Sequence, residues 1–198
     1  MPTHRPPRKV VVTLLAALVA AGCSDSTGPA PTRPQADLNI LQLGSAAPPL
    51  VAASVTFQAC RGESAEGRLL FQNASGGEGE EFARLKLDGS TLFARPDGTR
   101  IADGECVDIT MGVSDPASRQ MLIQLEPTGL AFNPARPAEL RLDYGEAEGV
   151  DSDVERRIGI WRQERPTDPF TLIGSAVLKD AKEVEARLMG FSRYALAY

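Results

Sequence analysis

Residues 121–144 constrain the fold more than any other stretch, because they hold two runs of alternating apolar side chains separated by a proline-rich corner. The apolar positions are Met121, Ile123 and Leu125 in the first run, and Leu140, Leu142 and Tyr144 in the second. A period of two places such side chains on one face of a β-strand. Pro134 and Pro137, which donate no backbone hydrogen bond, keep the corner out of a regular ladder. The stretch predicts two strands joined by a stiff connection.

The same alternation recurs along the chain from residue 52 onward. Further candidate strands lie at 55–57, 69–71, 83–87, 92–93, 107–113, 158–161, 170–177 and 184–188. Three turn signals at hairpin spacing separate some of them, namely Asp88-Gly89, Asp97-Gly98 and Asp103-Gly104. Residues 179–189 are rich in helix formers, but their alternation favours a strand. Many short strands with turns between them predict an all-β fold, an antiparallel β-sandwich over residues 52–198.

The first 22 residues have the pattern of an export signal. Arg5, Arg8 and Lys9 give a basic start, and residues 10–19 are apolar but too few to span a bilayer comfortably. The ending, Ala20-Ala21-Gly22-Cys23, resembles the bacterial lipobox, although leucine is commoner than alanine at position 20. The resemblance implies that residues 1–22 are a lipoprotein signal peptide and that Cys23 receives lipid. Ordinary secretory cleavage is the alternative.

A lipid on Cys23 would make the membrane the first partner of this chain and the bacterial cell envelope its location. Several acyl chains on one residue anchor stably, because each buried methylene contributes about 0.8 kcal/mol. Ser24 follows the cysteine, where an aspartate would favour retention in the inner membrane. The resemblance therefore implies the outer membrane in preference to the inner.

Residues 23–51 have the composition of a flexible tether. They are rich in Ser, Thr, Ala and Gly, and contain Pro29, Pro31, Pro34, Pro48 and Pro49. An apolar patch interrupts this composition at Leu38, Ile40, Leu41 and Leu43. Two alternatives stay open for the patch, docking on the folded domain or disorder.

The charge balance argues against nucleic acid as a partner. The formal net charge is -5, from 21 basic and 26 acidic side chains. Removing residues 1–22 removes three basic side chains and no acidic one, which leaves 18 against 26, or -8. An acidic mature chain repels phosphate backbones.

Cys60 and Cys106 remain as an even pair if Cys23 carries lipid. In an exported chain such a pair predicts one disulfide, and two free buried thiols are the alternative. A zinc site is a weaker hypothesis than either, because two cysteines without a histidine do not complete a tetrahedral zinc shell. There is no calcium-loop motif and no phosphate-binding glycine motif either. We therefore expect neither a metal nor a cofactor.

Three segments carry a family resemblance. They are residues 125–140, residues 158–161 (Ile-Gly-Ile-Trp), and residues 190–197 (Gly-Phe-Ser-Arg-Tyr-Ala-Leu-Ala). The pattern resembles the β-sandwich domain of zonula occludens proteins, netrin receptors and ankyrins, which also has counterparts in bacterial envelope lipoproteins. It covers residues 107–198 well, and residues 55–105 as leading strands. The resemblance implies a structural, adhesive or protein-binding module.

Gly190, Phe191 and Ser192 resemble a degenerate form of the self-cleavage motif found in some members of that family and in a related domain. In the active motif, a histidine removes the proton from a hydroxyl that attacks the preceding carbonyl. Here Gly190 stands where the histidine should be, and His4, inside the signal, is the only histidine of the chain. General-base help of this kind is worth about 10² to 10⁴ in rate. We therefore expect no self-cleavage, and Ser192 to be an ordinary strand residue.

The sequence gives only weak support to other catalytic or ligand-binding sites. Two acidic clusters, Asp151, Asp153 and Glu155, and Glu78, Glu80 and Glu81, are more typical of solvated loops than of calcium or glycoside sites. Trp161 with Tyr144 or Phe170 would form a sugar-stacking platform if exposed, but a single tryptophan in a sandwich is usually core. The sequence thus predicts a non-enzymatic, membrane-anchored lipoprotein with an envelope protein or glycan partner. A glycan-binding or glycan-acting module is the alternative.

Overall fold

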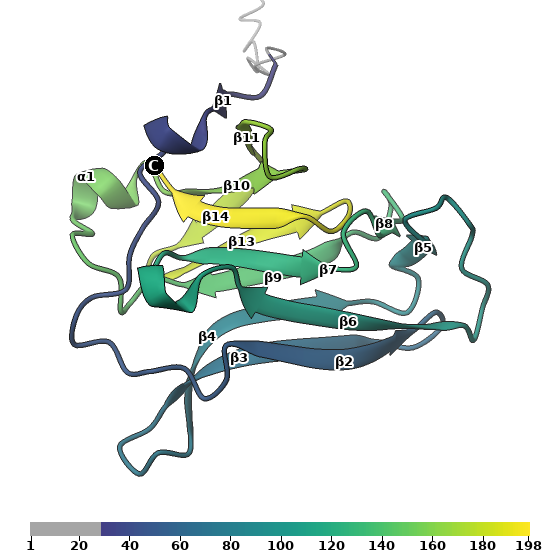
Figure 1. The fold of residues 1–198 in the computed structure, drawn as a ribbon, viewed down its shortest axis with the longest axis horizontal. Helices are drawn as coiled ribbons and strands as arrows, with labels where there is room; N and C mark the ends of the chain where they lie inside the picture. The colour runs from purple at the N-terminus through teal and green to yellow at the C-terminus, as the bar shows by residue number, and fades with distance from the viewer. Residues whose placement is uncertain (1–28) are drawn as a thin grey trace, which may run out of the picture.

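The computed structural model describes residues 29–198, which form two packed antiparallel sheets and a short third one (Figure 1). The larger sheet has seven strands in the order β1-β11-β10-β14-β7-β6-β2. Its strands are β1 (Thr32–Arg33), β2 (Ser54–Cys60), β6 (Cys106–Val113), β7 (Leu122–Glu126), β10 (Gly159–Gln163), β11 (Phe170–Leu172) and β14 (Arg193–Ala197).

The second sheet has five strands in the order β12-β13-β9-β4-β3. Its strands are β3 (Ala65–Gln72), β4 (Glu78–Leu87), β9 (Ala138–Asp143), β12 (Ser175–Leu178) and β13 (Glu183–Leu188). The third sheet pairs β5 (Leu92–Ala94) with β8 (Ala131–Phe132). Helical structure in the described residues is limited to η1 (Gln35–Asp37), η2 (Pro116–Ser118) and α1 (Ser152–Glu155). The all-β, sandwich-like fold predicted from the sequence is confirmed.

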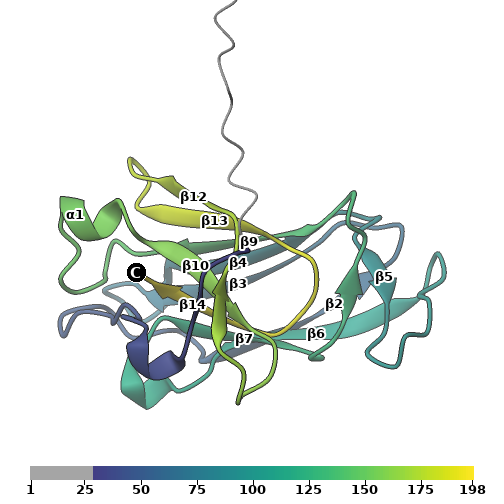
Figure 2. The ribbon, with the colours of Figure 1, turned by 90° about the horizontal axis from the view of Figure 1, so that it is seen from above.

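The alternating side chains point where the period of two places them. Ile109 and Met111 of β6, Ile123 and Leu125 of β7, and Leu140 and Leu142 of β9 are all buried. β7 and β9, the two strands predicted within residues 121–144, lie in different sheets and face each other across the core. Their connection holds β8 and crosses from one sheet to the other (Figure 2).

Strand pairing differs from the prediction at three places. The Asp88-Gly89 turn does not close a hairpin of β4 with β5, because β5 pairs instead with β8. The Asp103-Gly104 turn closes no hairpin either, because β6 after it pairs with β2 and β7. The single strand expected at 170–177 is two strands, β11 and β12, which belong to different sheets. Gly174 lies in the two-residue corner between them. The strand expected at 184–188 is confirmed as β13, and the helical alternative for this segment is wrong.

Residues 31–51, here called the arm, are part of the folded structure. The arm starts at β1, runs along one side of the sandwich and reaches β2 at the far side (Figure 1). Single bridges tie it to both sheets, with Ile40 opposite Ala197 and Leu50 opposite Phe71. Leu38 and Leu41 are buried, at 7% and 3% exposure. Docking is thus the correct alternative for the apolar patch, and the folded region begins about twenty residues before position 52.

The arm completes a second, smaller core on the outer face of the seven-stranded sheet. Leu38 covers Leu122, Trp161 and Phe170 there, together with Ala195 and Ala197. Most other buried side chains lie in one main cluster that includes residues from both large sheets. A sheet with apolar side chains on both faces needs a cover on each. The arm supplies the outer cover through Leu38 and Ile40, whereas its Leu41 packs in the main cluster.

Candidate functional site

The disulfide predicted between Cys60 and Cys106 is present. The two residues lie directly opposite each other at the ends of β2 and β6, with their Cα atoms 3.9 Å apart. The chain has three cysteines, and this bond accounts for two of them, which leaves Cys23 outside the pair. Cys23 and the signal peptide expected at 1–22 lie outside the described residues.

Gly190, Phe191 and Ser192 connect β13 to β14, and all three are buried. Ser192 lies just before β14 and not within a strand as expected. Its hydroxyl accepts a hydrogen bond from Arg162 Nε at 3.0 Å. The Phe191 carbonyl, which the hydroxyl would have to attack, accepts a hydrogen bond from the Gly129 N–H at 3.1 Å. A guanidinium donates protons and cannot accept one, so Arg162 does not replace the missing base.

Gly190 cannot be exchanged for the histidine of an active motif in this backbone. A Cβ atom at Gly190 would lie 2.8 Å from the carbonyl oxygen of Leu130. The neighbouring Tyr194 is fully buried, and its hydroxyl donates to the Gly190 carbonyl at 2.5 Å. Close packing, rather than a catalytic arrangement, explains the glycine and the tyrosine of this segment.

The two acidic clusters serve the local structure. Asp151 caps α1, because its carboxylate accepts from the N–H groups of Asp153 and Val154. The hydrogen bond from the Val154 N–H is the largest cause that lowers the pKa of Asp151. In the other cluster, Glu81 pairs with Arg68 and Arg84. Within residues 29–198 no group of three or more His, Cys, Asp or Glu side chains is placed to hold a metal ion.

The aromatic residues considered for sugar stacking do not form a platform. Tyr144 and Trp161 are 2% and 4% exposed, and Phe170 is fully buried. Tyr144 belongs to the main core, whereas Trp161 and Phe170 belong to the small core under the arm. The indole Nε1–H of Trp161 donates to the Ala197 carbonyl at 3.3 Å. These three side chains therefore hold the fold together and offer no face to a sugar.

Sequence reasoning missed a polar cluster around Glu155. The carboxylate accepts from the Tyr144 hydroxyl at 2.9 Å and from Lys182 Nζ at 2.8 Å, and Lys179 Nζ lies 3.6 Å away. These contacts lower the pKa of Glu155, with the hydrogen bond from Lys182 as the largest cause. Burial is the largest cause that raises the pKa of Tyr144. The cluster connects α1 to the end of β9 and to the β12–β13 turn. No local sequence pattern predicts this tertiary contact.

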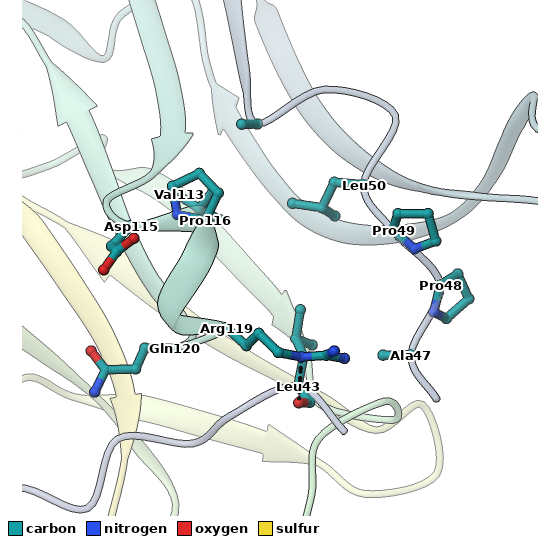
Figure 3. Close-up of a pocket in the computed structure, with 11 residues that line it drawn as sticks. Leu43, Ala47, Pro48, Pro49, Leu50, Val113, Asp115, Pro116, Arg119 and Gln120 are labelled. Carbon is teal, nitrogen blue, oxygen red and sulfur yellow. Dashed lines mark hydrogen bonds between the residues drawn. The ribbon is translucent and has the colours of Figure 1, made fainter. Parts of the chain in front are cut away.

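The sequence also gave no sign of an apolar groove between the arm and the β6–β7 connection. This end groove has a volume of about 360 Å³. Figure 3 shows prolines and Leu50 of the arm on one wall and Val113 and Pro116 on the other. Arg119 lies at the base, where its Nε donates to the Leu43 carbonyl at 3.2 Å and its Nη2 donates to the Gly44 carbonyl. The groove has apolar walls and a cation that is already bonded to the arm.

The outer face of the five-stranded sheet carries many charged side chains on β3, β4, β9 and β13, whereas β12 exposes Leu178 there. Arg68, Arg84 and Arg141 are direct cross-strand neighbours in β3, β4 and β9. Like charges in such positions repel. Here each arginine pairs with carboxylates, and Arg141 contacts Glu139, Glu183 and Glu185 at 2.8 to 3.6 Å. Five carboxylates pair with these three arginines, so this face is a network of ion pairs and not a cationic patch.

No helix within residues 29–198 has the length and apolar character needed to cross a membrane. Comparisons of the chain with known protein families, with characterised proteins and with solved structures found no match.

Proposed function

We propose that this protein is a non-enzymatic lipoprotein of the bacterial cell envelope, whose β-sandwich acts as a structural, adhesive or protein-binding module. The disulfide is the observation that carries the proposal. It pairs Cys60 with Cys106, so Cys23 alone is left, directly after the apolar run and the small residues of a lipobox-like ending. A disulfide between strands also fits an exported protein, because thiols stay reduced in the cytosol.

The arrangement around Ser192 supports the non-enzymatic part of the proposal. Ser192 is 1% exposed, its hydroxyl is bonded to a guanidinium, and the carbonyl before it is bonded to the Gly129 N–H. A nucleophile needs an acceptor for its proton and access to its substrate, and this hydroxyl has neither. The glycan-binding alternative gains no support, because the aromatic side chains it required are buried.

The anchor can be tested with a matched pair of substitutions, Cys23→Ala and the neighbouring Ser24→Ala. We expect palmitate labelling and recovery in the membrane fraction for the unsubstituted chain and for Ser24→Ala. Cys23→Ala should lose both. Equal membrane recovery and no palmitate in all three chains would overturn the anchor. If the module does not cleave itself, all three chains should stay intact, with no cleavage product that ends at Phe191.

A further inference from the structure

The placement of the arm limits how far the folded domain can stand from its anchor. The Leu172 N–H donates to the Pro31 carbonyl at 2.9 Å, and β1 pairs with β11 immediately afterwards. The chain is therefore joined to the sandwich from Pro31 onward. Cys23 precedes Pro31 by eight residues. Eight residues span at most about 28 Å whatever their conformation, whereas the 29 residues from Cys23 to Ala52 would have spanned about 100 Å.

The chain enters the fold at one edge, which selects the surface nearest the anchor. β1 is the outermost strand of the seven-stranded sheet, and its Arg33 pairs with Phe170, next to the 164–169 turn. The turn that joins β3 to β4, residues 73–77, lies at the opposite end of the molecule (Figure 1). A tether this short brings the β1–β11 edge, and not the 73–77 turn, to the membrane.

The charge at this edge permits close approach to a phospholipid surface. The ionisable side chains of η1, β1 and the β10–β11 hairpin are Arg33, Arg162 and Arg165, and Asp37, Glu164 and Asp168. Three cations and three carboxylates sum to zero, whereas the chain after position 22 carries -8. Anionic headgroups repel an acidic surface. The β1–β11 edge is thus free of the net repulsion that the chain as a whole would meet.

Arg33 and Arg165 strengthen this contact. Both are exposed, and neither forms an ion pair with another side chain of residues 29–198. Arg33 lies over the Trp161 ring, with the guanidinium carbon 5.4 Å from the ring centroid. An arginine fork binds phosphate oxygens in a bidentate manner.

We infer that the edge formed by β1, β11 and the 164–169 turn is a membrane-facing surface, which rests on the phospholipid headgroups of the membrane that holds Cys23. This inference rests on the proposed lipid at Cys23. The 73–77 turn then points away from the bilayer. A partner that binds the domain is restricted to the membrane-proximal layer.

Trp161, the only tryptophan of the chain, allows a test without substitution in the folded domain. The lipidated protein is placed in phospholipid vesicles that carry a dansyl group on some headgroups, and energy transfer from Trp161 to the dansyl group is measured. An insert of twenty Gly and Ser residues after Gly28 raises the average reach of the tether from about 16 Å to about 29 Å. We expect transfer to fall at least twofold. The same insert within the 73–77 turn is the control and should leave transfer unchanged.

Orientation is tested with a single tryptophan moved to either end of the molecule in a Trp161→Phe chain. Thr167→Trp places it in the turn beside β1, and Ala74→Trp places it in the 73–77 turn. Both positions are exposed. We expect at least twofold more transfer from position 167 than from position 74.

The outcomes separate this inference from the proposed function. Intact mass of the same samples shows whether Cys23 carries lipid, and its absence would overturn both the anchor and the placement. Two results with a lipidated chain would overturn the placement alone. One is energy transfer from Trp161 that does not change with the insert after Gly28. The other is equal energy transfer from tryptophans at positions 167 and 74.

Discussion

The hydroxyl of Tyr144, at the end of β9, donates a hydrogen bond to Glu155 Oε1 across the gap to α1 at 2.9 Å. Lys182 donates to the same oxygen at 2.8 Å. The end of β9, α1 and the β12–β13 turn thus meet at one carboxylate.

Tyr144→Phe removes one donor from this carboxylate and keeps the ring in the core. We expect the free energy of unfolding to fall by roughly 1.5 kcal/mol, the worth of a hydrogen bond to a charged group. Urea unfolding at pH 7 measures the change. Tyr198→Phe, at a tyrosine that makes no side-chain hydrogen bond among the described residues, is the control and should be neutral. Equal stability of the two variants would contradict the role of the cluster.

Glu155→Gln should destabilise the protein at neutral pH in a pH-dependent way. The contacts lower the pKa of Glu155 below its value in the unfolded chain, about 4.3. Such a group stabilises the fold above the unfolded pKa, and the stabilisation is lost as pH falls through the folded pKa. The difference between the unsubstituted chain and Glu155→Gln should therefore shrink below pH 4. A difference that stays constant from pH 7 to pH 3 would exclude the ionised carboxylate as its cause. Glu148→Gln, at an exposed glutamate, is the matched control.

Asp143 predicts the opposite pH dependence. Burial, followed by nearby Glu183, Glu80 and Glu146, raises its pKa to about 6, against a hydrogen bond from the Gly145 N–H that lowers it. A raised pKa stabilises the fold below the unfolded value, and that contribution is lost as pH rises through 6. Asp143→Asn should thus gain roughly 1 kcal/mol at pH 7, after allowance for solvent screening, and nothing at pH 3.5. Thermal unfolding at the two pH values checks this. A loss of stability at pH 7, with Asp108→Asn neutral, would contradict it.

The alternating strands could be predicted because their signal is local. Both β9 and β13 bury every second side chain, a pattern that a short window reveals. The choice of partner is not local, and this is why the pairing of β5 with β8, nearly forty residues apart, was missed. Asp88-Gly89 still makes a turn, but β5, the strand after it, forms its ladder with β8 and not with β4.

The arm marks the other limit of sequence reasoning. Leu38 and Leu41 point into two different apolar clusters, so they follow neither the period of a strand nor that of a helix. Composition alone made the segment resemble a tether. The disulfide could be predicted from cysteine number and compartment, whereas the Glu155 cluster and the end groove depend on tertiary contacts.

Leu41→Ala tests whether the arm belongs to the folded domain. Leu41 is 3% exposed in the main core, so its truncation should cost about 3 kcal/mol in unfolding free energy. Leu38→Ala should in addition shift the emission of Trp161 to longer wavelength, because Leu38 covers that ring. Gln35→Ala, at an exposed position of η1, should change neither quantity. An arm that is only a tether would tolerate all three substitutions equally.

Reduction of the disulfide should destabilise the protein markedly. The bond joins residues 46 positions apart, and closing a loop of that length contributes about 4 kcal/mol in the chain-entropy model. The Cys60→Ser, Cys106→Ser double variant should lose a similar amount in urea unfolding, and reductant should not affect it further. Insensitivity of the unsubstituted chain to reductant would show that the two thiols are free.

Gly190→His should fail to restore self-cleavage. The added Cβ meets the Leu130 carbonyl oxygen, so both Gly190→His and Gly190→Ala should cost about 2 kcal/mol in stability. Gly174→Ala is the matched control, because nothing lies within 4 Å of its added Cβ. Electrophoresis should show one uncut chain in each case. Cleavage between Phe191 and Ser192 in Gly190→His would mean that the site retains more of its chemistry than its geometry suggests.

The intact mass of the protein from the native membrane fraction, taken with and without reductant and thiol alkylation, tests the central claim most directly. The account predicts a chain that begins at lipid-modified Cys23 and runs unbroken to Tyr198. Two alkyl groups, on Cys60 and Cys106, should appear only after reduction. A chain that begins elsewhere, or that carries no lipid at Cys23, would contradict the anchored module proposed here.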